Sequence, residues 1–229
     1  MQNLHSGPNT RELGPGPTLI VFSVAAGLFL AIALAITLST PLTELDAQAE
    51  MWLHVRATPL LSNAMAAVSF LGAPTTLTVV AVAGSLLLWY WRRHSEAATL
   101  STVVLGGNFL NFCLKHLIQR GRPVFDDPIL SLPTYSFPSG HAMASTVFYG
   151  LLSIYALANA RQRSYAYIAV AAVVFTVALV SFSRVYLGLH YLSDVMGGIA
   201  EGIAWLAFCF AALRYMRRGE SNTGVDADS

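Results

Sequence analysis

Long stretches without a charged residue constrain this chain more than any other feature of its sequence. Residues 18–43, 57–91, 97–114 and 164–183 contain no Asp, Glu, Lys or Arg, and residues 195–213 contain only Glu201. In a sixth stretch, residues 141–160, only His141 can carry a positive charge. A helix needs about 20 apolar residues to cross a bilayer core. With 55% hydrophobic and 11% charged residues, the composition is typical of a membrane protein.

The positions of these stretches predict an all-α, polytopic membrane helix bundle with six transmembrane helices. We expect the spans at residues 18–39, 74–91, 97–118, 140–160, 164–185 and 190–214. The first apolar run is longer than the core of a cleavable signal peptide, so this span should be retained. Gly72-Ala73-Pro74 breaks the longest run, because proline favours the first turn of a new helix.

Residues 46–71 mix charges with large apolar side chains such as Trp52 and Met65. This mixture favours short amphipathic helices that lie along the membrane interface between the first two spans. A tilted extra span is the alternative. We interpret residues 1–17 as a disordered leader, residues 18–218 as the six-helix domain and residues 219–229 as a disordered tail.

The charges in the loops predict an orientation. If the N-terminus is cytoplasmic, the inner side holds Arg11, Arg92, Arg93, Arg161, Arg163, Arg214, Arg217 and Arg218. This distribution satisfies the positive-inside rule. It predicts a multi-pass protein of the cell (inner) membrane with both termini in the cytoplasm. Most cations left on the outer side belong to three short polar islands, residues 115–123, 138–141 and 183–194.

The first island combines the chain's only lysine with an arginine. Lys115 ends a span, and Arg122-Pro123 follows seven residues later, after a turn predicted at Gly121. An arginine offers a planar fork for two phosphate oxygens, whereas a lysine acts as a point charge. A lysine that only reaches toward the interface is the alternative for Lys115. We interpret Arg120 and His116 as solvated or interfacial.

The second island, Pro138-Ser139-Gly140-His141, opens the fourth span. Serine is a good N-cap, and the backbone amides at such a helix start bind anions. Gly140 would let a ligand approach the backbone closely. His141 could donate a proton to a leaving oxygen.

In the third island Arg184 ends the fifth span, Gly188 allows the chain to reverse, and His190 begins the sixth span. Asp194 follows four residues later, and residues four apart share a helix face. Asp194 can therefore accept a hydrogen bond from Nδ1 of His190, which leaves Nε2 free as a nucleophile. A purely structural hydrogen bond between the two is the alternative.

Together these residues resemble a known family. Lys115 with Arg122-Pro123, Pro138-Ser139-Gly140-His141, and Ser183-Arg184 with His190 and Asp194 look like the three-part signature of the type-2 phosphatidic acid phosphatase superfamily. The resemblance implies a six-helix membrane phosphatase that works without a metal or other cofactor through a phosphohistidine. It implies His190 as the nucleophile, Asp194 as its partner, His141 as general acid and then base, Lys115, Arg122 and Arg184 as the phosphate clamp, and Ser139 and Gly140 as further phosphate-binding residues.

The residues agree with a reaction that needs no metal. The acids on the outer side cluster only as Asp126-Asp127, and fixed cations can neutralise phosphate charge as a metal ion does. Cys113 and Cys209 fall inside predicted spans, where we give them no disulfide or metal-binding role.

We therefore expect a hydrolase of a lipid phosphate or diphosphate, with the bilayer and the lipid as partners, no nucleic acid, and an active site on the outer, periplasmic face. Undecaprenyl diphosphate, phosphatidylglycerol phosphate, phosphatidic acid and lipid A phosphate are all open as substrates. A lipid-linked phosphotransferase with the same site is the first alternative. An anion carrier is the second, although the sequence shows neither convincing inverted repeats nor helix breaks.

Two hypotheses concern residues outside the signature. Tyr135 and Phe137, just before the second island, could wall the path of the lipid into the site. Glu201 lies seven residues after Asp194 on the same helix face. Intramembrane acids usually find partners inside the bundle, so we favour a structural contact with Asn108 or Asn111 over a place in the pocket floor.

Overall fold

The structure is a computed structural model that describes residues 15–130, 132–159 and 162–223. These residues form eight helices: α1 (Pro15–Thr37), α2 (Pro41–His54), α3 (Pro59–Leu71), α4 (Pro74–Tyr90), α5 (His94–Ile118), α6 (Gly140–Asn159), α7 (Arg163–Tyr186) and α8 (Leu192–Thr223). Six segments are long and apolar enough to cross a membrane: Gly16–Thr37, Pro59–Tyr90, His94–Ile118, Gly140–Ala158, Arg163–Tyr186 and Leu192–Met216. The predicted six-span helical bundle is confirmed.

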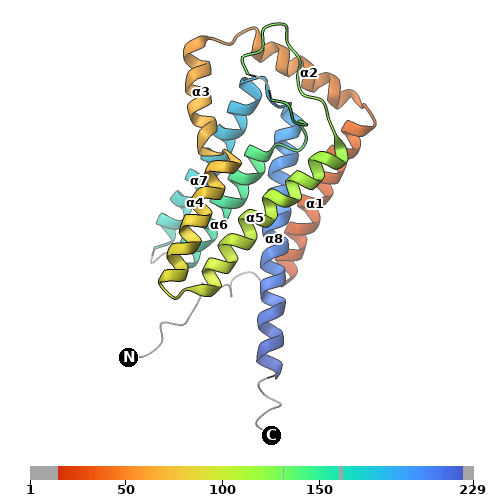
Figure 1. Cartoon of the computed structure of the whole chain (residues 1–229). Helices are drawn as coiled ribbons and strands as arrows, with labels where there is room; N and C mark the ends of the chain where they lie inside the picture. Colours follow the sequence, from red (N-terminus) through yellow and green to blue (C-terminus); the bar gives the residue numbers. More distant parts are fainter. Residues whose placement is uncertain (1–14, 131, 160–161, 224–229) are drawn as a thin grey trace.

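The spanning helices alternate in direction, so that one end of the bundle carries the start of α1 and the end of α8 (Figure 1). The turn from α4 to α5 lies at this same end. The opposite end carries α2, the long connection from α5 to α6, and the short turn from α7 to α8. All three polar islands therefore belong to the end of the bundle opposite the start of α1 and the end of α8.

The segment between the first two spans differs in part from the prediction. Helix α2 crosses the end of the bundle, as an interfacial helix would, but α3 runs in the direction of α4 (Figure 1). Together α3 and α4 form one apolar candidate span, Pro59–Tyr90. The predicted break is present, because α3 ends at Leu71 and α4 begins at Pro74. A Cβ atom at Gly72 would overlap Val180 of α7, so the break also lets α3 pack closely against that helix.

Helix α6 lies at the centre of the bundle and contacts α4, α5, α7 and α8. Its buried side chains Met143, Val147 and Leu151 pack in one apolar cluster with Leu77 of α4 and Val103 of α5. Between membrane helices such contacts stabilise through van der Waals packing, because lipid tails are as apolar as the side chains. This packing fixes α6, whose first turn carries the second polar island.

Glycine brings α8 against the start of α6. A Cβ atom at Gly198 would overlap the backbone oxygen of Ser139, and one at Gly202 would lie 2.8 Å from Cβ of Thr146. The close helix packing that small residues allow in membranes therefore holds the second and third islands together.

The ends of the domain differ slightly from the predicted boundaries. Helix α1 begins at Pro15, within the predicted leader, and α8 continues to Thr223, within the predicted tail. Residues 1–14 and 224–229, on which the rest of both predictions falls, lie outside the described residues.

Candidate active site

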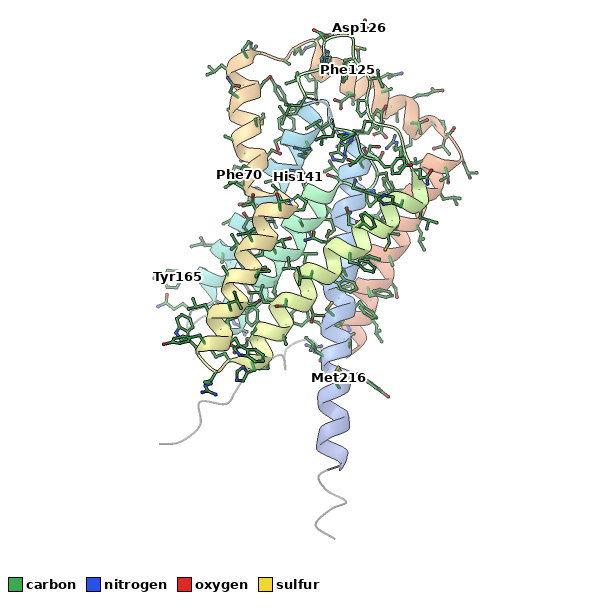
Figure 2. All side chains as sticks on the ribbon, viewed as in Figure 1. Phe70, Phe125, Asp126, His141, Tyr165 and Met216 are labelled. Atoms are coloured by element: carbon green, nitrogen blue, oxygen red, sulfur yellow. The ribbon has the colours of Figure 1, made fainter. Side chains whose placement is uncertain are left out.

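The three polar islands meet at the end of the bundle that is closed by α2 and the α5–α6 connection. Figure 2 places His141 inside the bundle beneath the connection that carries Phe125 and Asp126, and far from Tyr165 and Met216 at the opposite end. His190 and Asp194 are 2% and 0% exposed. These two side chains are thus enclosed by protein, whereas Lys115, Arg122 and His141 are half-buried.

Arg122 joins the first island to the third. Its Nη1 donates to the backbone oxygen of Leu189 and lies 3.4 Å from Nε2 of His190. Its Nε donates to the oxygen of Thr134 at 2.6 Å and its Nη2 to the oxygen of Tyr135 at 3.2 Å. One guanidinium therefore fastens both ends of the α5–α6 connection to the turn before α8.

Lys115 joins the first island to the second. Its Nζ donates to the backbone oxygens of Tyr135 at 3.0 Å and Ser136 at 3.2 Å. A Cβ atom at Gly140 would lie 3.9 Å from its Cε. The lysine therefore ends beside the first turn of α6, where we predicted an anion site.

Arg184 completes the cationic group. It is 4% exposed, and its Nη1 donates to Oγ of Ser69 at 2.6 Å. The charges of Lys115, Arg122 and Arg184 act on both His141 and His190. The three cations and the two histidines, which come from the three polar islands, are close enough to interact electrostatically.

His190 and Asp194 are neighbours, but not for the reason that we predicted. Helix α8 begins at Leu192, so His190 precedes the helix and does not share a helix face with Asp194. Asp194 lies in the first turn and accepts a hydrogen bond from the backbone N–H of Tyr191 at 2.9 Å, as in a capping box. This bond turns the carboxylate back toward the preceding turn, and its Oδ2 lies 3.5 Å from Nδ1 of His190.

The chain reverses between α7 and α8 at Gly188, as predicted. This residue has φ of +72°, a left-handed conformation that glycine adopts readily. Helix α5 ends at Ile118, the end predicted for the third span. Its C-cap is Gln119, in the left-handed conformation, so the chain leaves the helix two residues before Gly121, where the sequence suggested a turn.

Burial and the nearby cations lower the pKa of His190 well below its usual range. Desolvation of the imidazolium is the larger cause, and the charges of Lys115, Arg122 and Arg184 add to it. At neutral pH His190 is therefore an uncharged imidazole with a lone pair, the form that a nucleophile requires.

Several buried polar atoms of the site have no hydrogen-bond partner among the described residues: Oγ of Ser139, Nε of Arg184 and Nδ1 of His190. Unpaired buried polar groups are destabilising and uncommon in proteins. Nδ1 of His190 faces Oδ2 of Asp194 at 3.5 Å, whereas Oγ of Ser139 and Nε of Arg184 are left with unused hydrogen-bonding capacity. Ser139 precedes α6 as predicted, but its side chain does not cap the helix.

Arg120 is the main correction to the sequence-based interpretation, which took it as solvated or interfacial. Only 9% of its side chain is exposed, and its Nη1 donates to Oδ1 of Asp194 at 2.6 Å. Its Nη2 pairs with Asp46 of α2 at 2.8 Å. The neighbouring His116 is exposed, as predicted. The sequence offered no signal for the partner of Arg120, because Asp46 lies in the segment taken as interfacial.

Two hypotheses from the sequence have different outcomes. Phe137 is fully buried and packs on Phe29 of α1, with ring centroids 5.5 Å apart, so it belongs to the core and does not wall a path into the site. Glu201 accepts from Nδ2 of Asn111 at 2.8 Å, which supports the structural role. Asn108 donates instead to Thr78.

The end of the bundle that carries the site also holds more carboxylates than the sequence indicated. Asp46 and Glu50 of α2 are 3% and 2% exposed, and the charges of Asp46 and Asp194 both act on Glu50. In the described part of the chain no three His, Cys, Asp or Glu side chains are arranged to hold a metal ion. The carboxylate charges are instead opposed by Arg120 and the clamp.

Glu50 makes the stability of the protein depend on pH. Its carboxyl oxygens have no hydrogen-bond partner among the described residues, and burial, with smaller contributions from Asp194 and Asp46, raises its pKa to about 8. An unfolded glutamate releases its proton near pH 4.5. Between these values the folded state holds more protons than the unfolded state, so stability falls as pH rises from about 4.5 to about 8.

We therefore expect Glu50→Gln to have a Tm above that of the wild type by a margin that grows by several degrees between pH 5 and pH 8. Above pH 8 the margin should stay constant, because Glu50 is then ionised in both states. Thermal unfolding in one detergent across this range measures it. Glu44→Gln, at an exposed position of the same helix, is the control and should show no such trend. A constant margin for Glu50→Gln would contradict the assignment.

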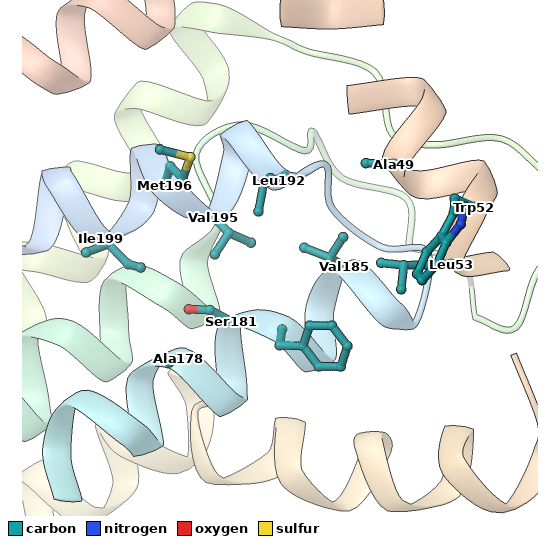
Figure 3. A pocket seen from close by; sticks show the side chains of 11 residues that line it. Ala49, Trp52, Leu53, Ala178, Ser181, Val185, Leu192, Val195, Met196 and Ile199 are labelled. Carbon is teal, nitrogen blue, oxygen red and sulfur yellow. The ribbon is translucent and has the colours of Figure 1, made fainter. Parts of the chain in front are cut away.

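An apolar cavity of about 530 Å³ lies between α2, α7 and α8 (Figure 3). It is lined by Ala49, Trp52, Leu53, Ala178, Ser181, Phe182, Val185, Leu192, Val195, Met196 and Ile199. The lining suits a hydrocarbon chain and offers no cation to a phosphate. This cavity is distinct from the polar site, none of whose predicted residues line it.

Comparison with known proteins identifies the family. The sequence matches the PAP2 superfamily over residues 96–218, more than half of the chain. It is 31% identical over 149 residues to phosphatidylglycerophosphatase B of Bacillus subtilis, covering 63% of this chain and 71% of that protein. It is 27% identical over 161 residues to lipid A 4'-phosphatase of Porphyromonas gingivalis, covering 64% and 65%. A match to lipid phosphate phosphatase delta of Arabidopsis thaliana has 27% identity and covers 58% of this chain but 35% of that protein.

The fold agrees with the sequence match. A crystal structure of a transmembrane PAP2 type phosphatidylglycerolphosphate phosphatase from Bacillus subtilis has a TM-score of 0.74 and 26% identity, and the match covers 85% of this chain and 96% of that one. The matched residues include all three polar islands. The chain therefore belongs to the PAP2 superfamily, as a member that spans the membrane.

Proposed function

We propose that this protein, a membrane lipid phosphatase of the PAP2 type, hydrolyses a lipid phosphate or diphosphate through a covalent phosphohistidine at His190. The relatives named above are lipid phosphatases, which supports the class of reaction. One observation supports the mechanism most strongly: Nε2 of a buried, uncharged His190 lies 3.4 Å from the Arg122 guanidinium. A phosphate held by that guanidinium would be within reach of the imidazole lone pair.

In the first step Nε2 of His190 forms a bond to phosphorus while the bond from phosphorus to the lipid oxygen breaks. His141 gives a proton to the departing oxygen. Lys115, Arg122 and Arg184 oppose the charge on the phosphoryl oxygens, and Ser139 and the amides near Gly140 donate hydrogen bonds to them. Asp194 accepts from Nδ1 and stabilises the positive charge that His190 acquires.

In the second step a water molecule gives a proton to His141 and attacks phosphorus. The nitrogen–phosphorus bond breaks, and orthophosphate leaves with His190 again uncharged. No step requires a metal ion, because three fixed cations carry out the charge neutralisation that a metal performs in other phosphoryl-transfer enzymes.

The site should face outward. The turn from α4 to α5, with Arg92 and Arg93, lies at the end of the bundle opposite to the site (Figure 1). The first residue of α7, Arg163, adds a third basic residue outside the polar islands. By the positive-inside rule the end with these arginines is cytoplasmic, which puts the phosphate site on the outer face of a cell membrane.

A panel of lipid phosphates in detergent micelles tests the proposed reaction. We expect purified protein to release orthophosphate without an added acceptor and with full activity in EDTA. Phosphatidylglycerol phosphate is the first substrate to test, because both a relative found by sequence and a similar solved structure are named for it. Undecaprenyl diphosphate, phosphatidic acid and lipid A phosphate complete the panel. Release that requires an alcohol acceptor would favour a phosphotransferase, and loss of activity in EDTA would contradict the metal-free mechanism.

A further inference from the structure

Arg120 bridges two buried carboxylates beside the candidate active site. It donates to Oδ1 of Asp194 at 2.6 Å and to Oδ2 of Asp46 at 2.8 Å. The exposed fractions of the three side chains are 9%, 0% and 2%. Its guanidinium also lies over the ring of Tyr191, with Cζ 4.2 Å from the centroid. Contacts on several sides hold this arginine in one orientation.

Asp46 of α2 also binds the first turn of α8. It accepts from the backbone N–H of Ser193 at 3.0 Å and from the Ser193 hydroxyl. Ser193 lies in the first turn of α8, where backbone N–H groups have no partner within the helix and favour a nearby negative charge. Helix α2 therefore supplies a cap for α8 from a distant part of the chain, and the same carboxylate orients Arg120.

The network divides the oxygens of Asp194 between two tasks. Oδ1 is bound by Arg120, while Oδ2 accepts from Tyr191 and lies 3.5 Å from Nδ1 of His190. With Oδ1 fixed, the carboxylate cannot rotate away from the imidazole. The charge of Arg120 also stabilises the ionised carboxylate, so the proton shared with His190 should stay on Nδ1 during attack.

We propose that Arg120 and Asp46 are positioning residues for the His190–Asp194 pair, so that α2 contributes to the activity through Asp194 without touching the substrate. This inference rests on the proposed function. It adds two residues that are not among the predicted site residues. It also assigns α2, which contributes none of the predicted site residues, a role in the reaction.

The test uses 4-nitrophenyl phosphate and measures the single-turnover rate of phosphoenzyme formation. In Arg120→Met this rate should fall about 10–100-fold, by analogy with the loss of an outer partner of a metal ligand, while KM changes little. Asp46→Asn, which keeps the size of the side chain, should reduce the rate by a smaller factor. Arg56→Met is the matched control, because Arg56 is an exposed arginine at the same end of the bundle and should leave the rate unchanged.

A second measurement separates positioning from general stability. In an Asp194→Asn background Arg120→Met should lower the rate by less than about threefold, because residues that act through one partner are not additive. An equal loss in both backgrounds, or a normal rate for Arg120→Met in the otherwise unchanged protein, would overturn the inference and leave the proposed function standing. Absence of any phosphoenzyme in the wild type would overturn the proposed function, and the inference with it.

Discussion

Replacing His190 with alanine should reduce orthophosphate release from a lipid phosphate by at least about 1,000-fold, the scale on which loss of a nucleophile acts. Alanine cannot form a bond to phosphorus, and the remaining cations can bind the phosphate but not attack it. The effect should therefore lie in kcat, with substrate binding largely kept. Measurement of kcat and KM in detergent micelles checks both statements.

His116→Ala is the matched control for this prediction. His116 is an exposed histidine on the last turn of α5, and its Nδ1 is paired with the backbone oxygen of Phe112. Its replacement should leave kcat within about twofold of the wild type, as is usual for a surface position. If His190→Ala kept a large share of the activity while folding normally, another residue would have to be the nucleophile.

Replacing His141 with alanine should have an effect that depends on the leaving group. A lipid alkoxide is a poor leaving group and needs a proton, so loss of the general acid should reduce the first step about 10²–10⁴-fold. A 4-nitrophenolate leaves without protonation, so the same step should be slowed far less with 4-nitrophenyl phosphate. Stopped-flow detection of nitrophenolate, beside quench-flow with the lipid, measures the two rates.

The second step gives an independent sign of the same role. His141→Ala lacks the base that activates water, so with 4-nitrophenyl phosphate it should show a burst of nitrophenolate followed by slow turnover. Equal losses for both substrates in the first step would show that His141 acts by holding the phosphate and not by moving a proton.

The sequence predicted the parts of the fold that depend on local composition. Each spanning helix follows from one run of apolar residues, and Pro74 marks the start of α4 as expected. The direction of α3 could not be predicted in this way, because α3 packs along α7 and approaches it closely where Gly72 meets Val180. The two residues are far apart in the chain, so no local sequence pattern indicates that they meet.

The candidate site likewise contains residues that the sequence indicated and residues that it did not. His141, His190 and the clamp residues were predicted as site residues because their types suit phosphoryl transfer and because they interrupt apolar surroundings. Arg120 was missed because its role depends on Asp46 and Asp194, each 74 residues away in sequence. The relation of His190 to Asp194 was attributed to a shared helix face, whereas the helix begins only at Leu192. Capping contacts and buried ion pairs between distant segments become visible only when the segments are placed in space.

The central claim is that His190 forms a covalent bond to the phosphoryl group of the substrate. Acid-labile, base-stable phosphate is the chemical mark of a phosphohistidine, and peptide mapping after a rapid alkaline quench locates it. With His141→Ala and 4-nitrophenyl phosphate, we predict nearly one phosphate per protein, bound to His190 and absent when His190 is also replaced. Label on another residue, or none during the nitrophenolate burst, would contradict the account.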